Sequence, residues 1–345
     1  MAFAKVSEPF EFTRLVSSEQ NAFSKFLGSI QEELILFESK LLDLIHVKAE
    51  TSKKITQHFF KQKGKRIRPA LFLSLCKSLG YTGEHLFSMA CVSEYVHTAS
   101  LLHDDVVDNS LTRRGFQTAH TLWGRPSTIL VGDLIYAQAS ELMAQTGELE
   151  IVSSYAKAIS QMSEGEIIQL ENVYNPELPE ETYTKIIRYK TASLLAATCK
   201  TAGILSKLSQ EKIIALEQFA QNLGISFQLV DDALDYASSQ NLLGKKRLKD
   251  LEEGKVTLPL ILLLKRSTLK EKEKIHSLFK KKLLTQIDIA YIDERIKYYK
   301  TSEETLSKAR SITEESIKKL DEAFPDQNTF NDLKELARNL SHRKY

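Results

Sequence analysis

The sequence predicts an all-α fold, a single large helix bundle around a deep apolar cavity. The 13 glycines and 7 prolines among 345 residues are about half of average usage, so the residues for the many turns of a β-sandwich, barrel or propeller are missing. Apolar residues recur at spacings of three and four, as at Phe23, Phe26, Leu27, Ile30 and Leu34, which is the period of a helix. A hydrophobic content of 42% excludes global disorder.

Gly and Pro end the periodic runs and divide the chain into helices joined by short loops. These breaks fall at 80–83, 124–126, 176–179, 203, 244 and 254. No composition shift or low-complexity tract marks a linker. We therefore expect one domain over 1–345, with a motif-bearing core at about 60–265 and outer, Lys- and Glu-rich helices at 266–345.

Charge and cysteine content narrow the function class. A formal net charge of +2 gives no field for non-specific nucleic-acid binding, so no nucleic-acid partner is expected. The cysteines Cys76, Cys91 and Cys199 have no metal-binding or disulfide spacing and are expected to be reduced core residues of a cytoplasmic protein. The first residues form no signal peptide, and the longest apolar run, 256–264, is too short to span a bilayer.

Two segments are apolar on nearly all sides and should lie at the centre of the bundle, 88–103 and 219–230. Each leads directly into an Asp-Asp-x-x-Asp box, at 104–108 and 231–235. Positions i and i+4 share a helix face, so Asp104 pairs with Asp108 and Asp231 with Asp235. Each box thus presents two carboxylates side by side.

Paired carboxylates need a positive partner. Like charges at this spacing destabilise a helix by roughly 0.2–0.5 kcal/mol, and by more where solvent is excluded. Oxygen ligands without His or Cys favour Mg²⁺, which takes one or two carboxylates and shares its other positions with water and a substrate phosphate. A single acid box is more often a solvated helix end. Two identical boxes, each after an apolar helix, favour a metal site.

Cations are placed beside these boxes. The loop 64–69 (GKRIRP) carries Lys65 and Arg68 just before a helix, and a helix N-terminus with Arg and Lys is a favourable place for a diphosphate. Further cations follow the first box or flank the second, namely Arg113, Arg114, Lys190, Lys245 and Lys255. Any one of them alone is more often a solvated surface residue. Together with an apolar interior that keeps water from a carbocation, they predict chemistry with diphosphate as leaving group.

The order of these motifs resembles the trans-polyprenyl diphosphate synthases, in particular their long-chain members of the octaprenyl type. The likeness covers about residues 64–259. It rests on GKRIRP, HTASLLHDDVVDNSLTRRG, LVGDLIYAQA, EGEIIQLEN, YKTASL, FQLVDDALDY and DLEEGKVTLP. Class I terpene cyclases resemble this pattern in the first acid box only.

The resemblance implies a role for each site residue. Mg²⁺ is expected on Asp104, Asp108 and Asp231, with Asp235 in support. The allylic diphosphate is expected on Arg113, Lys190 and Lys255. Isopentenyl diphosphate is expected on Lys65, Arg68, His97 and Arg114, although His97 by itself would be taken for a core histidine. Thr191 and Gln228 would face the reacting carbons, and Lys245 would reach the departing diphosphate.

The implied reaction is ionisation of the allylic diphosphate, attack by the isopentenyl double bond and loss of a proton to the released diphosphate. Ala99, five residues before Asp104 and next to Ser100, stands where short-chain members carry a bulky aromatic residue. It would leave a product tunnel open, so a long product is predicted. The resemblance also implies a homodimer, a quinone side chain as the use of the product, and a product that can associate with membranes.

Two positions depart from the family pattern. Leu248 replaces the glycine before the final acidic loop, which could alter how that loop closes, and Lys63 replaces a glycine that often precedes GKRxRP. Alternatives also stay open at this point. They are a farnesyl or geranylgeranyl synthase, the catalytic subunit of a heteromeric long-chain synthase, and a non-enzymatic helical scaffold that binds a prenyl lipid.

Overall fold

The structure is a computed structural model that describes residues 19–62, 64–237, 248–325 and 330–342. Its N-terminal half contains α1 (Glu19–Gly28), α2 (Gln31–Asp43), α3 (Glu50–Lys61), α4 (Ile67–Ser78), α5 (Leu86–Val107), β1 (Thr112–Arg113), β2 (Phe116–Gln117), α6 (Ala119–Trp123), α7 (Arg125–Gln145) and α8 (Leu149–Glu171). Its C-terminal half contains α9 (Glu180–Ile187), the π-helix η1 (Arg188–Ala192), α10 (Ser193–Leu205), α11 (Gln210–Ala237), α12 (Lys249–Glu252), α13 (Leu258–Arg266), α14 (Leu269–Phe279), α15 (Gln286–Tyr299), α16 (Thr301–Ala323) and α17 (Asn331–Ser341).

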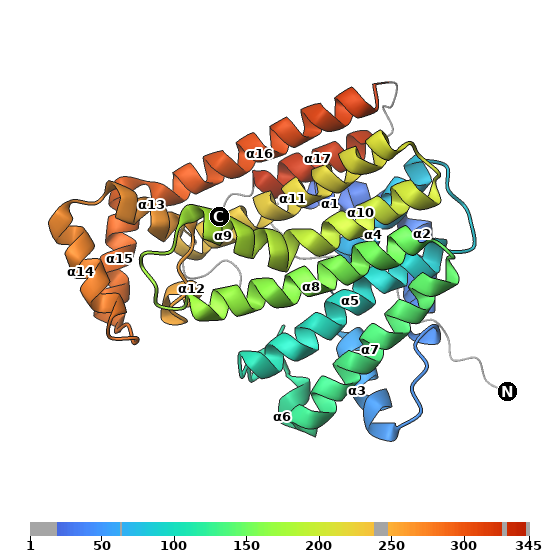
Figure 1. The fold of residues 1–345 in the computed structure, drawn as a ribbon, viewed down its shortest axis with the longest axis horizontal. Coiled ribbons are helices and arrows are strands. Elements are labelled where there is room, and N and C mark those ends of the chain that lie inside the picture. Colours follow the sequence, from blue (N-terminus) through green and yellow to red (C-terminus); the bar gives the residue numbers. More distant parts are fainter. Residues whose placement is uncertain (1–18, 63, 238–247, 326–329, 343–345) are drawn as a thin grey trace.

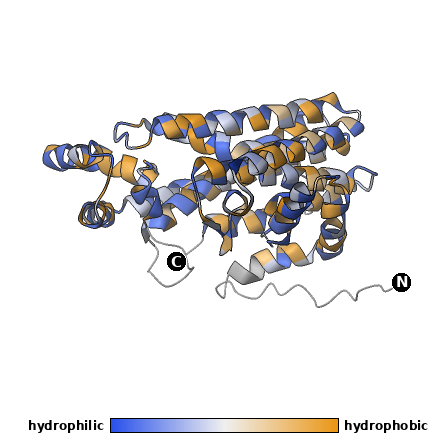
Figure 2. Ribbon diagram, turned by 90° about the horizontal axis from the view of Figure 1, so that it is seen from below, coloured by the Kyte–Doolittle hydropathy of each residue, from blue (hydrophilic) through white to orange (hydrophobic). Residues whose placement is uncertain are grey.

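Long helices lie side by side in one bundle, which confirms the predicted fold class. In Figure 1, α16, α11, α10, α8, α5 and α7 follow one another across the molecule. Packing agrees with this order, because α11 contacts both α16 and α10, α10 contacts α8, and α5 contacts α7. Apolar and polar residues alternate around most helices in Figure 2, as amphipathic helices require. No helix in the described ranges has the length and apolar character needed to cross a membrane.

The two segments predicted to be central are buried. Met89, Tyr95 and Val96 of α5 are fully buried, and Phe219 and Ala220 of α11 are nearly so. The three cysteines are also buried and are not bonded to one another. The expectation of reduced core thiols is met for all three.

The apolar core forms two clusters. The larger joins α4, α5, α7, α10 and the first part of α11. The smaller joins α9, the last turns of α11, and α12 to α15 with part of α16. The helix that carries the first acid box therefore belongs to one cluster and the end of the helix that carries the second box belongs to the other.

A short antiparallel hairpin is the sole β structure in the described part of the chain. Arg113 pairs with Phe116 across it, and Arg114 (φ +51°) and Gly115 (φ +82°) form the turn. Two consecutive residues with positive φ are typical of a type I′ turn, whose twist suits a hairpin. This turn sets the directions of Arg113 and Arg114 after the first acid box.

Candidate active site

The first acid box forms the end of α5. Asp108 follows the last helical residue, and its N–H bonds the Asp104 carbonyl at 2.8 Å. Asp105 is buried and accepts hydrogen bonds from Arg113 Nε at 2.8 and 3.0 Å. Arg113 Nη2 lies 2.8 Å from the same carboxylate. Asp105 thus anchors the hairpin through Arg113. Its role differs from the one predicted for the i, i+4 pair Asp104 and Asp108, which is to bind metal.

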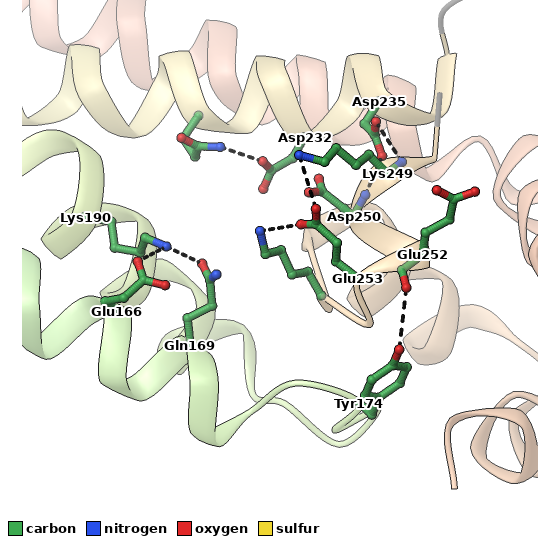
Figure 3. A network of polar contacts seen from close by, with 12 residues as sticks. Glu166, Gln169, Tyr174, Lys190, Asp232, Asp235, Lys249, Asp250, Glu252 and Glu253 are labelled. Atoms are coloured by element: carbon green, nitrogen blue, oxygen red, sulfur yellow. Dashed lines mark hydrogen bonds and ion pairs between the residues drawn. The ribbon is translucent and has the colours of Figure 1, made fainter. Parts of the chain in front are cut away.

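Asp104 faces α8. Burial together with the nearby carboxylates of Glu166 and Asp108, against the opposing effect of Lys190, raises its pKa to about 6. Glu166 forms an ion pair with Lys190, whose ammonium also donates to Gln169 Oε1 at 3.0 Å. Lys190, a predicted diphosphate ligand, is therefore held by Glu166 and Gln169 of α8 (Figure 3).

The second acid box divides its carboxylates between two environments. Asp232 is 4% exposed, and it accepts a hydrogen bond from the Tyr183 hydroxyl at 2.6 Å and from Gln228 Nε2 at 2.8 Å. Burial and the neighbouring Asp250 raise the pKa of Asp232 to about 8. Asp231 and Asp235 are only half-buried. The prediction that these two share a face is consistent with this division.

Asp235 holds the segment that follows. It accepts the backbone N–H groups of Lys249 at 3.3 Å and Asp250 at 3.2 Å, and its own carbonyl accepts the N–H of Leu248 at 3.1 Å. Leu248 has φ +62°, a conformation natural to glycine. Burial and Asp235 raise the pKa of Asp250 to about 6. The predicted Lys245 lies outside the described residues.

Lys255 closes this side of the site. Its ammonium lies 2.6 Å from Glu253. Burial lowers the pKa of Lys255, but Glu253, Asp108 and Asp250 together raise it by more. The charge of Lys255 is thus felt by the first acid box and by the segment after the second. Lys255 and Asp232 of the second box also line one cavity.

The GKRIRP loop separates its cations by role. Arg66, with φ +48° at the start of α4, is buried and donates to Glu38 at 2.8 Å and Glu94 at 2.5 Å. Arg68 Nε is buried without a hydrogen-bond partner among the described residues. Lys65 is exposed. Arg66, the third cation of this loop, therefore stabilises the fold through these ion pairs.

A cluster of positive groups surrounds Arg68. Burial and the charge of Arg114, against the opposing effect of Glu94, lower the pKa of Arg68 to about 10. Burial, followed by Arg68, Arg114 and Arg113, also holds the pKa of His97 well below its ordinary value. Arg114 reaches back to Gly64, where a Cβ would stand 2.7 Å from the guanidinium. Positive side chains gathered in this way favour the binding of an anion such as a phosphate group.

Thr191 and Gln228 meet between these groups. The Thr191 hydroxyl donates to Gln228 Oε1 at 2.9 Å. Thr191 belongs to η1, which is packed between α8 and α11 so closely that a Cβ on Gly165 or Gly224 would collide with it, at 2.8 Å from Tyr189 and 2.5 Å from Ala192. The π-helix thereby projects Lys190 and Thr191 toward the same space.

That space is a cavity of about 170 Å³. Four predicted residues line it, namely Lys190, Thr191, Gln228 and Lys255. Polar residues that were not predicted line it too, including Gln169, Asn172, Tyr183, Asp232 and Asp250. Gln169 lies within the EGEIIQLEN motif and Asp250 within DLEEGK, so their motifs could have indicated them. Nothing in the sequence near Tyr183 points to the site.

The predicted tunnel residue lies elsewhere. Ala99 is fully buried on α5 within the larger apolar cluster. It does not line the cavity between Lys190 and Lys255. The deep apolar cavity and the role of Ala99 in product length therefore stay predictions.

The donor set suits Mg²⁺ that is shared with a substrate. No three His, Cys, Asp or Glu side chains in the described ranges converge on one point, so these carboxylates do not form a closed protein cage. Asp104, Asp108 and Asp231 offer oxygen ligands from two sides, as Mg²⁺ held by one or two carboxylates and phosphate oxygens requires.

Several known proteins have sequences similar to this chain. Residues 49–296 match the polyprenyl synthetase family. The chain is 42% identical over 198 residues to octaprenyl diphosphate synthase of Escherichia coli (strain K12), a match over 57% of this chain and 61% of that protein. It thus aligns with about three fifths of that relative. Identity to a prenyl transferase of Cyanidium caldarium is 33% over 329 residues, which are 93% of this chain and 98% of that protein.

Solved structures are similar over nearly the whole chain. A decaprenyl diphosphate synthase from Rhodobacter capsulatus superposes with a TM-score of 0.86 at 30% identity, covering 93% of this chain and 100% of that one. A polyprenyl synthase from Caulobacter crescentus CB15, complexed with calcium and isoprenyl diphosphate, gives a TM-score of 0.84 at 32% identity, covering 94% and 98%. The likeness extends from the motifs to the complete bundle.

Proposed function

Because this chain belongs to the polyprenyl synthetase family, we propose that it is a Mg²⁺-dependent prenyltransferase that condenses isopentenyl diphosphate successively onto an allylic diphosphate. The observation that carries this proposal is the presence of two separate groups of cations. Lys190 and Lys255 lie near carboxylates of the acid-box region, whereas Arg68 is grouped with Arg114 and His97. Two diphosphates can be held by two different sets of cations.

The residues divide the work by chemistry. Asp104, Asp108 and Asp231, with Asp235 in support, hold Mg²⁺, which neutralises the departing diphosphate. Lys190, Lys255 and Arg113 bind the allylic diphosphate, and Lys245 reaches the same group. Lys65, Arg68, His97 and Arg114 bind isopentenyl diphosphate. The oxygens of Thr191 and Gln228 lie where positive charge develops on the allylic carbons.

The product is a long all-trans prenyl chain of the octaprenyl type, which serves as a quinone side chain. The named relatives support a long product but differ among themselves, since they include octaprenyl, solanesyl and decaprenyl synthases. Ala99 is the residue in this chain that favours an open path. We further propose a cytoplasmic homodimer. Exposed apolar residues on α6 and α7, Leu122, Ile129 and Leu130, support an interface there.

The test incubates the purified protein with farnesyl diphosphate, isopentenyl diphosphate and Mg²⁺ and sizes the dephosphorylated products by chromatography. We expect a ladder that ends near seven to nine isoprene units, and none with EDTA or with Asp104→Ala. Products that stop at four units would identify a geranylgeranyl synthase. Absence of product despite Mg²⁺-dependent diphosphate binding would indicate a missing partner subunit or a scaffold.

Ala99→Phe tests the tunnel in the same assay. A ring at this position would block a chain that grows beside α5, so the ladder should shorten while total isopentenyl incorporation stays within a few-fold. Because Ala99 is fully buried, thermal unfolding of the variant must be measured alongside. Unchanged product length in a folded Ala99→Phe protein would place the tunnel elsewhere.

A further inference from the structure

Four side chains form one continuous series of hydrogen bonds beside the cavity. The Thr191 hydroxyl donates to Gln228 Oε1 at 2.9 Å, Gln228 Nε2 donates to Asp232 Oδ1 at 2.8 Å, and the Tyr183 hydroxyl donates to Asp232 Oδ2 at 2.6 Å. All four residues line the cavity. They come from α9, η1 and α11, so the series links three helical segments.

The series gives the Gln228 amide one orientation. An amide side chain carries a donor at one end and an acceptor at the other, and it can turn over unless its partners prevent this. Gln228 Nε2 donates to Asp232 Oδ1 and Gln228 Oε1 accepts from Thr191, so the nitrogen end faces Asp232 and the carbonyl end faces Thr191. The Thr191 hydroxyl then donates its only proton to Gln228. The lone pairs of the Thr191 oxygen can therefore face a positive charge in the cavity.

Tyr183 completes the arrangement from the opposite side. Its hydroxyl occupies the second Asp232 oxygen, and both residues are nearly excluded from water, at 3% and 4% exposure. The ring belongs to the smaller apolar cluster, which fixes where the hydroxyl stands. With both oxygens engaged and its side chain buried, Asp232 differs from its half-buried neighbours Asp231 and Asp235. It is suited to orienting groups within the protein.

We propose that Asp232 and Tyr183 are positioning residues, which hold Gln228 and Thr191 so that an oxygen lone pair faces the developing allylic cation. This inference rests on the prenyl-transfer function proposed above. It gives Asp232, the middle carboxylate of the second acid box, a role other than metal binding. It also brings a residue of α9, outside the acid boxes, into the catalytic design.

The test compares two ligands that differ in charge. One is an ammonium analogue of the allylic chain, offered with inorganic diphosphate and Mg²⁺; the other is neutral at the reacting carbon, farnesyl thiolodiphosphate. Tyr183→Phe and Asp232→Asn should weaken binding of the ammonium analogue about tenfold, the effect of losing one oriented hydrogen bond. Binding of the neutral analogue should stay within twofold. In the condensation assay kcat should fall about tenfold with both KM values within twofold.

Tyr155→Phe is the matched control. Tyr155 is also fully buried, and its hydroxyl bonds Thr198 at 3.5 Å in the larger apolar cluster, away from the cavity lining. Its removal should leave both ligands and kcat unchanged. A double-mutant cycle of Tyr183→Phe with Thr191→Val should be non-additive, because both changes interrupt the same series.

Several results would overturn the inference. Equal weakening of both analogues would mean a general structural role, and unchanged binding of both would mean no role. A raised Mg²⁺ requirement in Asp232→Asn would make Asp232 a metal ligand. If Asp232→Asn does not fold, Tyr183→Phe, which keeps the ring, decides the question. A wild-type protein that neither turns over substrate nor binds the thiolodiphosphate would instead remove the proposed function itself.

Discussion

At the scale of single residues, Asp104 shows how a proposed metal ligand can lower the stability of the fold. Burial, Glu166 and Asp108 raise its pKa to about 6, against an ordinary value of about 3.9 in an unfolded chain. Between these values the unfolded state ionises while the folded state keeps its proton. The free energy of unfolding of the metal-free protein therefore falls as the pH rises from about 4 to 6, and it stays at the lower value above pH 6.

Asp104→Asn should stabilise the metal-free protein. At pH 7.5 in EDTA the free energy of unfolding should rise by about 2 kcal/mol, because a buried charge is removed. The gain should vanish near pH 4, where the carboxyl is protonated in the folded state. Urea denaturation at the two pH values measures this, and Mg²⁺-dependent turnover should be lost in the same variant. A variant less stable than wild type at pH 7.5 would contradict the burial argument.

Leu248 occupies a position where the backbone conformation favours glycine. Its φ of +62° costs an L-residue roughly 1 kcal/mol, while its side chain packs on the smaller apolar cluster. Leu248→Gly loses packing but relieves strain; Leu248→Ala loses packing and keeps the strain. We expect the Gly variant to be about 1 kcal/mol more stable than the Ala variant in urea denaturation. The usual order, Ala above Gly, would show that this conformation is not strained.

At the scale of elements, the loop after α8 is hydrogen-bonded to the segment after α12. The N–H of Tyr174 donates to the carbonyl of Gly254 at 2.8 Å, and its hydroxyl reaches the Glu252 carbonyl at 3.5 Å. Gly254 has φ +71°, and a Cβ there would stand 2.5 Å from the Tyr174 ring. This contact fixes the position of the neighbouring Lys255 (Figure 3 shows Tyr174 and Glu252).

Gly254→Ala should therefore separate these two elements. The left-handed backbone and the collision with Tyr174 together should lower the free energy of unfolding by about 2 kcal/mol or more. The allylic KM should rise several-fold, because Lys255 is displaced. Adding Tyr174→Ala removes the collision and should restore part of the stability, while the backbone strain remains. Thermal unfolding of the single and the double variant compares them directly. If the double variant regains no stability, the backbone strain at residue 254 accounts for the whole loss.

Sequence periodicity predicted most helices and, through the i, i+4 rule, which face Asp231 and Asp235 share. It did not predict the hairpin, whose type I′ turn depends on Arg114 adopting positive φ, a conformation that glycine usually supplies. Nor did it predict η1 or Tyr183, because both depend on neighbours from α8 and α11 that lie far away in the sequence. Arg66 and Arg68 looked alike in the loop, and only the hydrogen bonds of Arg66 to Glu38 and to the buried Glu94 separate their roles.

At the scale of the whole molecule, the site lies between the two apolar clusters. The first acid box ends a helix of the larger cluster, and the second box with Asp250 and Lys255 belongs to the region of the smaller one. Like charges gather on each side of this boundary. Burial with Glu166 and Asp108 raises the pKa of Asp104, and burial with Asp235 and Asp231 raises that of Asp250. A ligand that joins both sides replaces repulsion with attraction.

Mg²⁺ and inorganic diphosphate together should raise the unfolding temperature. A ligand at a hundred times its dissociation constant stabilises the folded state by about 2.7 kcal/mol, and for a chain of this size we expect a shift of a few degrees. Either component alone should give less than half of the shift, because each leaves one set of charges unpaired. Differential scanning fluorimetry measures this. Asp104→Asn is the control, and the combined shift should shrink in it.

The π-helix η1 affects how such a site can change as the sequence evolves. The N–H of Ser193 bonds the carbonyl of Arg188, five residues earlier, so this turn contains one residue more than an α-helical turn. Each residue of an α-helix advances its direction by about 100°. Loss of a single residue here would restore a continuous helix and swing α9 by about that angle relative to α10, carrying Tyr183 away from Asp232. Substitutions can adjust this site gradually, whereas a change in chain length at η1 would re-aim it in one step.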